Sequence, residues 1–239
     1  MRFMIAHQTN AHWESGAIPD SALTARVGAF MGELAHAGVL LAAEGLRSSC
    51  EGVRLRFSGG QRTITPGPLE PGNELPAGFT ILHTSSIDEA IEWAARQAAI
   101  TGDVEVDIRP VMEPWDVGLG PPPPEPTRRY MVLRKATAAS EAGEQLSRHS
   151  RARLSDLIEA ATRNGAHVVS ERLKPSRRGR RLQNTKDGVV SFDGPFVETK
   201  ELLGGYAIVS SASLDEASRL AMRYIQTVGA EVVDVRELE

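Results

Sequence analysis

Residues 192–206 read F-D-G-P-F-V-E-T-K-E-L-L-G-G-Y, and the rest of the chain can be organised around this stretch. It starts at the end of an apolar strand and turns at Asp193-Gly194-Pro195, three residue types that favour turns. The stretch carries four charged side chains, and Gly204-Gly205 then lets the chain enter a strand at Tyr206. The pattern predicts a loop between two strands that holds a cluster of charges.

A second copy of this pattern lies 127 positions earlier in the chain. Gly67-Pro68-Leu69 corresponds to Gly194-Pro195-Phe196, and the offset stays constant from Arg2 to Met112 without insertion or deletion. A constant offset over this length indicates a tandem duplication. The same offset relates further pairs, namely Arg2 and Arg129, Gly38 and Gly165, Glu44 and Glu171, Asp88 and Asp215, and Arg109 and Arg236.

Each copy predicts the element order β-α-β-β-β-α-β. Strands at 2–7 and 129–135 come first, and each is followed by a helix whose apolar residues fall on one face. The second helix of each copy begins at Ser86-x-Asp-Glu or Ser213-x-Asp-Glu, where the serine suits an N-cap and the acids suit the first turn. We therefore expect an α+β fold of two ferredoxin-like repeats, with antiparallel sheets packed face to face to cover their free faces.

The quoted stretch resembles the signature of the YCII-related, or DGPF, family, whose pattern runs close to D-G-P-F-x-E-T-K-E-x-L-G-G-[FY]. Residues 37–46, A-G-V-L-L-A-A-E-G-L, and 106–110, V-D-I-R-P, add to the likeness, which covers both copies. The resemblance implies the dimeric α/β-barrel fold, in which two ferredoxin-like units pair their sheets. In a chain with two copies, the resemblance implies that the copies form one barrel within the chain, as an internal pseudo-dimer. Such a pseudo-dimer could also assemble into a higher oligomer.

The duplication also predicts domain boundaries. We expect a first repeat at 1–113 with a degenerate signature loop, a linker at 114–127, and a second repeat at 128–239 with the intact signature. Four consecutive prolines, 121–124, favour an extended polyproline II spacer and exclude a helix or a central strand. Docking of these prolines to a proline-binding partner is the alternative.

The charged residues of the second copy's signature loop are the candidate site. Asp193 could handle a proton, and a ligand could be bound by Glu198, Lys200, Glu201 and the aromatic ring of Tyr206. In the alternative interpretation, the charges pair with one another and order the loop, and Tyr206 is a core ring. The first copy keeps only Glu74 of the four charges, so the intact site is expected in the second copy.

His149 is the candidate general base that could act with Asp193. Enzymatic relatives in the resembled family imply a His/Asp proton-transfer site with the histidine on the first helix. Val27 and Leu154 stand at the corresponding places, so that histidine is missing and His149 is the nearest substitute. A solvated histidine at a helix start is the alternative.

Composition narrows the remaining classes of function. The 239 residues are 41% hydrophobic and 24% charged, with formal net charge −4, which is ordinary for a globular protein. The single cysteine, Cys50, excludes an internal disulfide, and no apolar run is long enough for a membrane span, so we expect a cytoplasmic protein without a membrane partner. The spacing of the histidines is not that of a metal site. The sequence also lacks a phosphate-binding glycine motif, so no cofactor is expected.

A basic cluster in the second copy raises the question of nucleic acid. It comprises Lys174, Arg177, Arg178, Arg180 and Arg181, but no aromatic residue interleaves with these side chains. A solvated hairpin is therefore favoured, and nucleic acid is not an expected partner.

Two functions follow from this reading. The first is binding or transformation of a small organic ligand by acid/base chemistry at the signature loop. The alternative is a non-catalytic regulatory or interaction protein, which the resembled family links to sigma-factor-dependent transcription. The sequence does not show whether the protein is an enzyme or what its substrate is.

Overall fold

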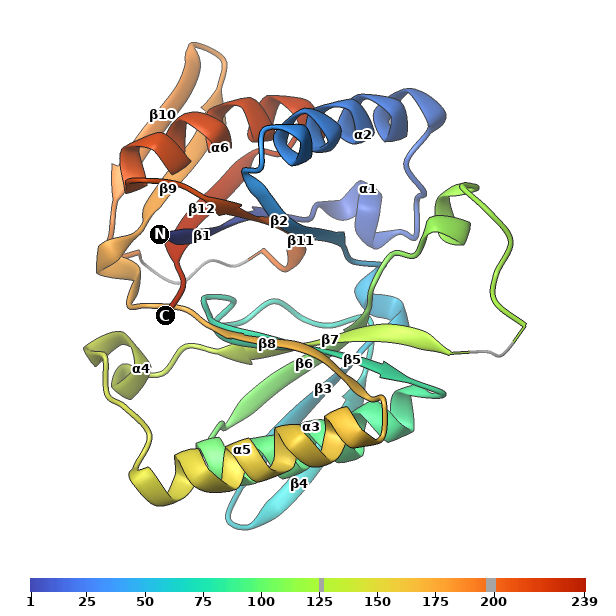
Figure 1. The fold of residues 1–239 in the computed structure, drawn as a ribbon, viewed down its shortest axis with the longest axis vertical. Helices are drawn as coiled ribbons and strands as arrows, with labels where there is room; N and C mark the ends of the chain where they lie inside the picture. Colours follow the sequence, from blue (N-terminus) through green and yellow to red (C-terminus); the bar gives the residue numbers. More distant parts are fainter. Residues whose placement is uncertain (125–126, 197–200) are drawn as a thin grey trace.

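The computed structural model describes residues 1–124, 127–196 and 201–239, which form two six-stranded sheets with helices on their outer faces (Figure 1). The first half contains β1 (Arg2–Gln8), α1 (Ala11–Glu14), α2 (Ser21–His36), β2 (Leu40–Gly45), η1 (Ser49–Glu51), β3 (Val53–Ser58), β4 (Gln61–Pro66), β5 (Pro76–Thr84), α3 (Ile87–Thr101), β6 (Glu105–Pro110) and η2 (Pro114–Val117). The second half contains β7 (Arg128–Lys135), α4 (Ala138–Ala142), α5 (Arg148–Arg163), β8 (His167–Arg172), η3 (Ser176–Arg178), β9 (Arg180–Thr185), β10 (Gly188–Asp193), β11 (Leu203–Ser210), α6 (Leu214–Val228) and β12 (Val232–Glu237).

The predicted helix signals act as expected. The Ser86 side chain accepts a hydrogen bond from the backbone N–H of Glu89 at the start of α3, and Ser213 does the same for Glu216 at the start of α6. Both helices end at a glycine in the left-handed region, which a residue without a Cβ adopts at low cost. The prediction of capped helices at these positions is confirmed.

The strand order shows that the two repeats exchange their first β-α-β units. One sheet has the order β10-β9-β12-β1-β11-β2 and the other has β4-β3-β6-β7-β5-β8, and the strand pairs within each are antiparallel. Strand β1 of the first repeat lies between β11 and β12 of the second, and β7 of the second lies between β5 and β6 of the first. The fold class of two packed antiparallel sheets is confirmed. The sequence did not predict that each sheet would be built from both repeats.

Three layers of apolar side chains hold the sheets and helices together. Along β1, Phe3 and Ile5 belong to the cluster under α2 and α6, whereas Met4 and Ala6 belong to the cluster that includes side chains from both sheets. This alternation follows from the two-residue period of a strand whose two faces are both covered. A third cluster lies under α3 and α5, so each outer face is covered by one helix from each repeat (Figure 1).

Candidate functional site

A cavity of about 440 Å³ opens where β1 ends, between α2, α6 and the η2 segment that follows the first repeat. Its lining residues come from both repeats and from η2, so the strand exchange creates it. A volume of this size suits a small organic ligand. We call this cavity the His7 pocket, after the histidine that β1 contributes to its wall.

His7 and Tyr224 form a hydrogen-bonded pair in the wall of the pocket. The His7 Nδ1 atom lies 2.7 Å from the Tyr224 hydroxyl oxygen. Burial, together with the positive charge of Arg109, lowers the pKa of His7 to about 4, so the imidazole is uncharged near neutral pH. Burial also raises the pKa of Tyr224, so its hydroxyl keeps its proton. The pair is a neutral donor and acceptor facing a cavity.

Gly204 and Gly205, the two glycines at the end of the signature stretch, leave room for the His7 ring. A Cβ atom added at Gly204 would lie 2.8 Å from the ring atoms Cδ2 and Nε2 of His7, and one added at Gly205 would lie 2.7 Å from Cε1. Both separations are shorter than van der Waals contact, so a side chain at Gly204 would displace the ring, and one at Gly205 would also meet the backbone oxygen of Glu44 at 2.7 Å. The signature of the second repeat therefore shapes the pocket around a histidine of the first.

The pocket has an apolar wall that contains an unpaired hydroxyl. Leu23, Val27 and Met31 line it from α2, and Val228 lines it from α6. The Thr24 hydroxyl oxygen is buried and has no hydrogen-bond partner within the described residues. Since this oxygen is buried behind the surface of the cavity, α2 presents a mainly apolar wall to a ligand.

Charged residues line another part of the pocket. Glu44 of β2 pairs with Arg129 of β7, and Glu113 accepts hydrogen bonds from the same guanidinium at 2.8 to 3.2 Å. Burial raises the pKa of Glu44 and the nearby charge of Glu113 adds to this, while Arg129 opposes both. Asp116 of η2 pairs with Arg128 at 2.8 Å and with Arg47 at 2.7 Å. These ion pairs attach the η2 segment to both sheets.

The pseudo-equivalent position in the other half of the molecule is occupied by an ion pair. Arg134 replaces His7 at the repeat offset, and its Nε donates to Asp103 at 2.9 Å. Both side chains are at least nine-tenths buried. Gln97 stands where the other half has Tyr224, and Asp103 stands where it has Ala230. A charged pair thus takes the place of the neutral pair.

The structure does not bring the predicted acid and base together. Asp193 lies at the end of the edge strand β10, is 73% exposed and pairs with Arg180 at 2.7 Å. His149 is exposed on α5, which covers the outer face of the other sheet (Figure 1). The proposed His149–Asp193 pair therefore does not form, because the two residues belong to different layers of the molecule.

The other predicted site residues lie in different environments. Glu198 and Lys200 lie outside the described residues, and Glu201 is exposed. Tyr206 is only 2% exposed, and its ring centroid lies 4.9 Å from that of Phe79 in the layer between the sheets. It also lines the His7 pocket, and burial raises its pKa. Tyr206 is therefore the predicted residue that contributes to this pocket.

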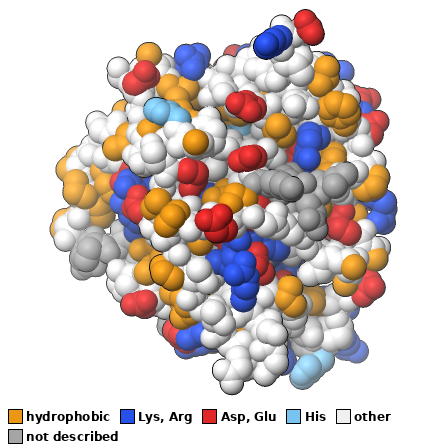
Figure 2. Space-filling view, turned by 180° about the vertical axis from the view of Figure 1, so that it is seen from behind, with side chains coloured by type: hydrophobic (Ala, Val, Ile, Leu, Met, Phe, Trp, Pro, Cys, Tyr) orange, Lys and Arg blue, Asp and Glu red, His pale blue; other side chains and the backbone are white. Residues whose placement is uncertain are grey.

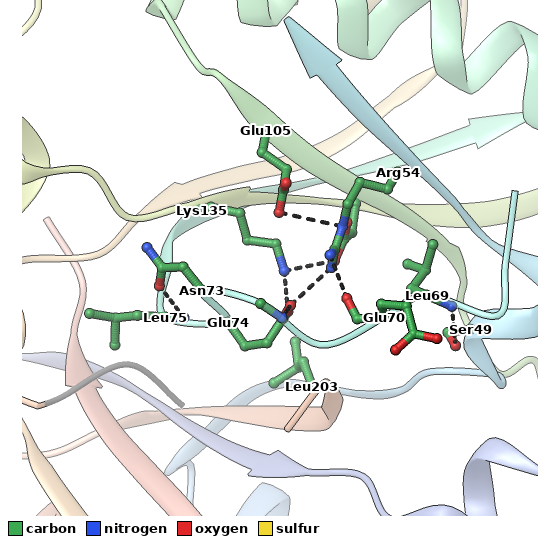
Figure 3. Close-up of polar contacts among 12 residues, drawn as sticks. Ser49, Arg54, Leu69, Glu70, Asn73, Glu74, Leu75, Glu105, Lys135 and Leu203 are labelled. Carbon is green, nitrogen blue, oxygen red and sulfur yellow. Dashed lines mark hydrogen bonds and ion pairs between the residues drawn. The ribbon is translucent and has the colours of Figure 1, made fainter. Parts of the chain in front are cut away.

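The counterpart loop in the first repeat holds a buried cluster of charges (Figure 3). Arg54 donates to Asp107 at 2.6 Å and to Glu74 at 2.9 Å, while Lys135 pairs with both carboxylates. Burial opposes ionisation of Asp107, but Arg54 and Lys135 lower its pKa. Asn73 donates to the backbone oxygen of Ala136 at 3.0 Å, so this loop is held to β7. Its Glu74 is structural and faces the cluster.

The basic cluster of the second repeat is largely neutralised by acids. Lys174 and Arg178 both pair with Glu237, and Arg181 pairs with Asp234. Acidic and basic side chains also intermingle on the face of the molecule shown in Figure 2. The ion pairs within the cluster reduce its net positive charge.

Neither a metal centre nor a membrane-spanning helix is found among the described residues. Within 1–124, 127–196 and 201–239, no group of three or more histidine, cysteine and acidic side chains is arranged to hold a metal ion. Over the same ranges, no helix is both long and apolar enough to cross a membrane.

Sequence comparison now assigns the family. The profile of the YCII-related domain matches residues 1–114 and again residues 129–239. The chain belongs to the YCII-related domain family. No curated protein and no solved structure matches it. Both YCII-related domains contribute to the His7 pocket, so the site belongs to the pair and to neither domain alone.

Sequence reasoning missed His7 and Tyr224 because it compared the signature loops of the two copies. Another signal was available, since His7 sits near the end of a predicted strand and its counterpart in the second copy is Arg134. A change between copies from an uncharged ring to a guanidinium, at a position next to the sheet core, marks a place where the two halves differ in chemistry.

Proposed function

We propose that this protein binds a small, largely apolar organic molecule in the His7 pocket, and that His7 and Tyr224 handle a proton or hydrogen bond on that molecule. The observation that carries the proposal is a neutral, hydrogen-bonded histidine and tyrosine in the wall of a cavity of about 440 Å³.

The chemistry of the pair follows from its charge state. A hydroxyl that keeps its proton can donate it to Nδ1 of His7, and Nε2 then carries the ring proton. In that tautomer Nε2 donates a hydrogen bond to a carbonyl or hydroxyl oxygen of the ligand. A neutral imidazole can support charge that develops on such an oxygen, whereas its low pKa makes it a weak base.

A pair of matched variants tests the binding site. Val27→Phe fills the pocket, while Leu154→Phe places the same side chain on α5 at the corresponding repeat position. We expect 4-phenylbutanol to raise the melting temperature of the unmodified protein and of Leu154→Phe, and to bind Val27→Phe at least about tenfold more weakly by calorimetry. Equal affinity for both variants would place the ligand elsewhere.

Changing His7 tests the role of the pair. His7→Ala should weaken the binding of 4-phenylbutanol by about tenfold, because one hydrogen bond between uncharged groups is lost. The corresponding carbon chain without the hydroxyl, butylbenzene, should bind both proteins alike. If His7→Ala weakens both ligands equally, the histidine contributes only packing.

A further inference from the structure

We infer that the Glu44 end of the His7 pocket is a subsite for a cationic group, so that the preferred ligand is an amine with an apolar body. This inference rests on the proposed function, because it assigns a substrate class to the same pocket. It concerns the charged part of the lining, which His7 and Tyr224 do not touch.

The charge of the lining favours a cation. Four carboxylates line the pocket, those of Glu44, Glu51, Glu113 and Asp116, against the two guanidinium groups of Arg47 and Arg129. Arg128 pairs with Asp116 as well, so the four carboxylates face three guanidinium groups and one negative charge is in surplus. His7 adds no positive charge near neutral pH. A cavity with surplus negative charge attracts cations and repels carboxylates, and both effects are strengthened where water is excluded.

Glu44 is the carboxylate with an unused acceptor. Both oxygens of Glu113 accept from Arg129, and both oxygens of Asp116 accept from Arg128. Both oxygens of Glu51 accept from Arg47. Within the described residues, Arg129 bonds to Oε1 of Glu44, and Oε2 has no hydrogen-bond partner.

The surroundings of Glu44 leave its charge under-compensated. Arg129 is shared between Glu44 and Glu113, so two carboxylates face one guanidinium. The Glu44 side chain is only 19% exposed, which limits compensation by water. Burial raises its pKa in keeping with this shortage of positive charge. An ammonium group that donates to Oε2 would supply the missing charge.

The path between His7 and Glu44 sets the shape of the ligand. His7 is paired with Gly205 on β11, and Gly205 is paired with Gly45 on β2, the residue after Glu44, so the two backbones lie two strand spacings apart, roughly 10 Å. The His7 side chain bonds to Tyr224 on the helix side of the sheet, whereas Glu44 bonds to Arg129 of the other sheet. A ligand that reaches both side chains therefore has to pass round the edge strand β2, which a flexible chain of about four methylenes between the amine and the aromatic group allows.

Three ligands that differ in their head group test the inference. We expect 4-phenylbutylamine to bind about tenfold more tightly than 4-phenylbutanol by calorimetry, and 4-phenylbutyrate to bind more weakly than either. In Glu44→Gln, the affinity for the amine should fall to that for the alcohol, and the affinity for the alcohol should stay the same. The amine's affinity for the unmodified protein should fall as salt is added, while the alcohol's affinity stays level.

Glu171→Gln is the matched control. Glu171 is the counterpart of Glu44 at the repeat offset and pairs with Arg2, the counterpart of Arg129, so its loss removes a similar tie between strands outside the pocket. It should leave the preference for the amine intact. If Glu44→Gln folds poorly, the relative affinities of the amine and the alcohol for the unmodified protein and for Glu171→Gln still decide the question.

The outcomes separate this inference from the proposed function. Equal binding of amine and alcohol, or an amine preference that survives Glu44→Gln, overturns the cation subsite while the pocket stands. Failure of all three ligands to bind overturns both. Loss of the preference in Glu171→Gln to the same extent as in Glu44→Gln would assign the effect to long-range charge and overturn the subsite.

Discussion

The His7 pocket and its counterpart around Arg134 have related backbones and opposite chemistry. In one, an uncharged histidine and a tyrosine line a cavity. In the other, the corresponding positions hold a buried arginine, its aspartate partner and a glutamine. A few side chains at fixed repeat positions therefore decide whether the end of the strand borders a cavity or an internal ion pair.

Residues that the two halves share serve the fold. Arg109 of one sheet donates to the Leu203 backbone oxygen of the other at 2.5 Å, and Arg236 makes the reciprocal bond to the Pro76 oxygen at 3.3 Å. Each arginine also pairs with a glutamate in the short helix that follows the first strand of its own repeat. Arg109 pairs with Glu14, and Arg236 pairs with Glu141. In this duplicated chain the differences between copies surround the cavity, and the shared residues hold the two sheets together.

Separating the repeats should disrupt both the His7 pocket and its counterpart around Arg134. Residues 1–113 and 127–239, produced apart, should each lack a complete sheet, because β1 and β2 pair with strands of the second repeat and β7 and β8 with strands of the first. We expect poor dispersion in NMR spectra of each piece and recovery of native spectra when the two are mixed. Two folded monomeric pieces that ignore each other would show that the exchange is unnecessary.

Arg134→Ala should destabilise the protein more than His7→Ala. The arginine's loss leaves Asp103 buried without its main partner, at a cost of about 3–5 kcal/mol. The histidine's loss removes one hydrogen bond beside an existing cavity, at a cost of about 1 kcal/mol. Urea denaturation of the two variants gives the comparison, and equal costs would mean that Arg134 is compensated by other contacts.

Gly204→Ala should convert the open site towards its counterpart, which has Ala77 at this position. The new methyl group would lie within 3 Å of the His7 ring and displace it. We expect a loss of about 1–3 kcal/mol of stability and at least about tenfold weaker ligand binding.

The reverse change, Ala77→Gly, is the control for backbone flexibility. It should not create binding in the other half, where Arg134 remains. Unchanged ligand affinity in Gly204→Ala would contradict the role of the signature glycines in shaping the pocket.

The titration of His7 should make stability depend on pH in one direction. The unfolded chain takes up a proton at the ordinary histidine pKa of about 6.5, whereas the folded pocket resists protonation until about pH 4. The contribution of neutral His7 is therefore complete above about pH 6.5 and is lost as pH falls from there to 4. We expect this loss to be about 1–2 kcal/mol, since the residue is partly exposed to the cavity and solvent reduces the cost of charging it.

His7→Gln supplies the baseline for that measurement, because it removes the titrating group and leaves the carboxylates in place. The difference in unfolding free energy between the two proteins should change across this pH range and stay level above it. A difference that does not vary with pH would show that His7 titrates normally.

Asp193→Ala and His149→Ala should have the smallest effects. The Asp193–Arg180 pair is largely exposed, and such pairs contribute about 0–1 kcal/mol. Neither residue lines the His7 pocket, so the affinity for 4-phenylbutanol should be unchanged. A large loss of affinity in Asp193→Ala would return the site to the signature loop.

The sequence by itself determined the duplication, the order of the elements and the ends of the helices. These depend on local or periodic signals, such as the capping residues Ser86 and Ser213 and the constant offset between copies. It also predicted the packing of two antiparallel sheets, because an amphipathic sheet with helices on one side must cover its other face.

Only the tertiary structure decided which strands pair and where the pocket lies. Two copies with the same alternating pattern offer β1 nearly equivalent partners in either repeat, so the pattern cannot distinguish exchange from its absence. The pocket then combines His7 and Glu44 of one repeat, Gly204 and Tyr224 of the other, and the η2 segment. Contacts between residues so far apart in the chain leave no local signal, because they exist only once the strands have exchanged.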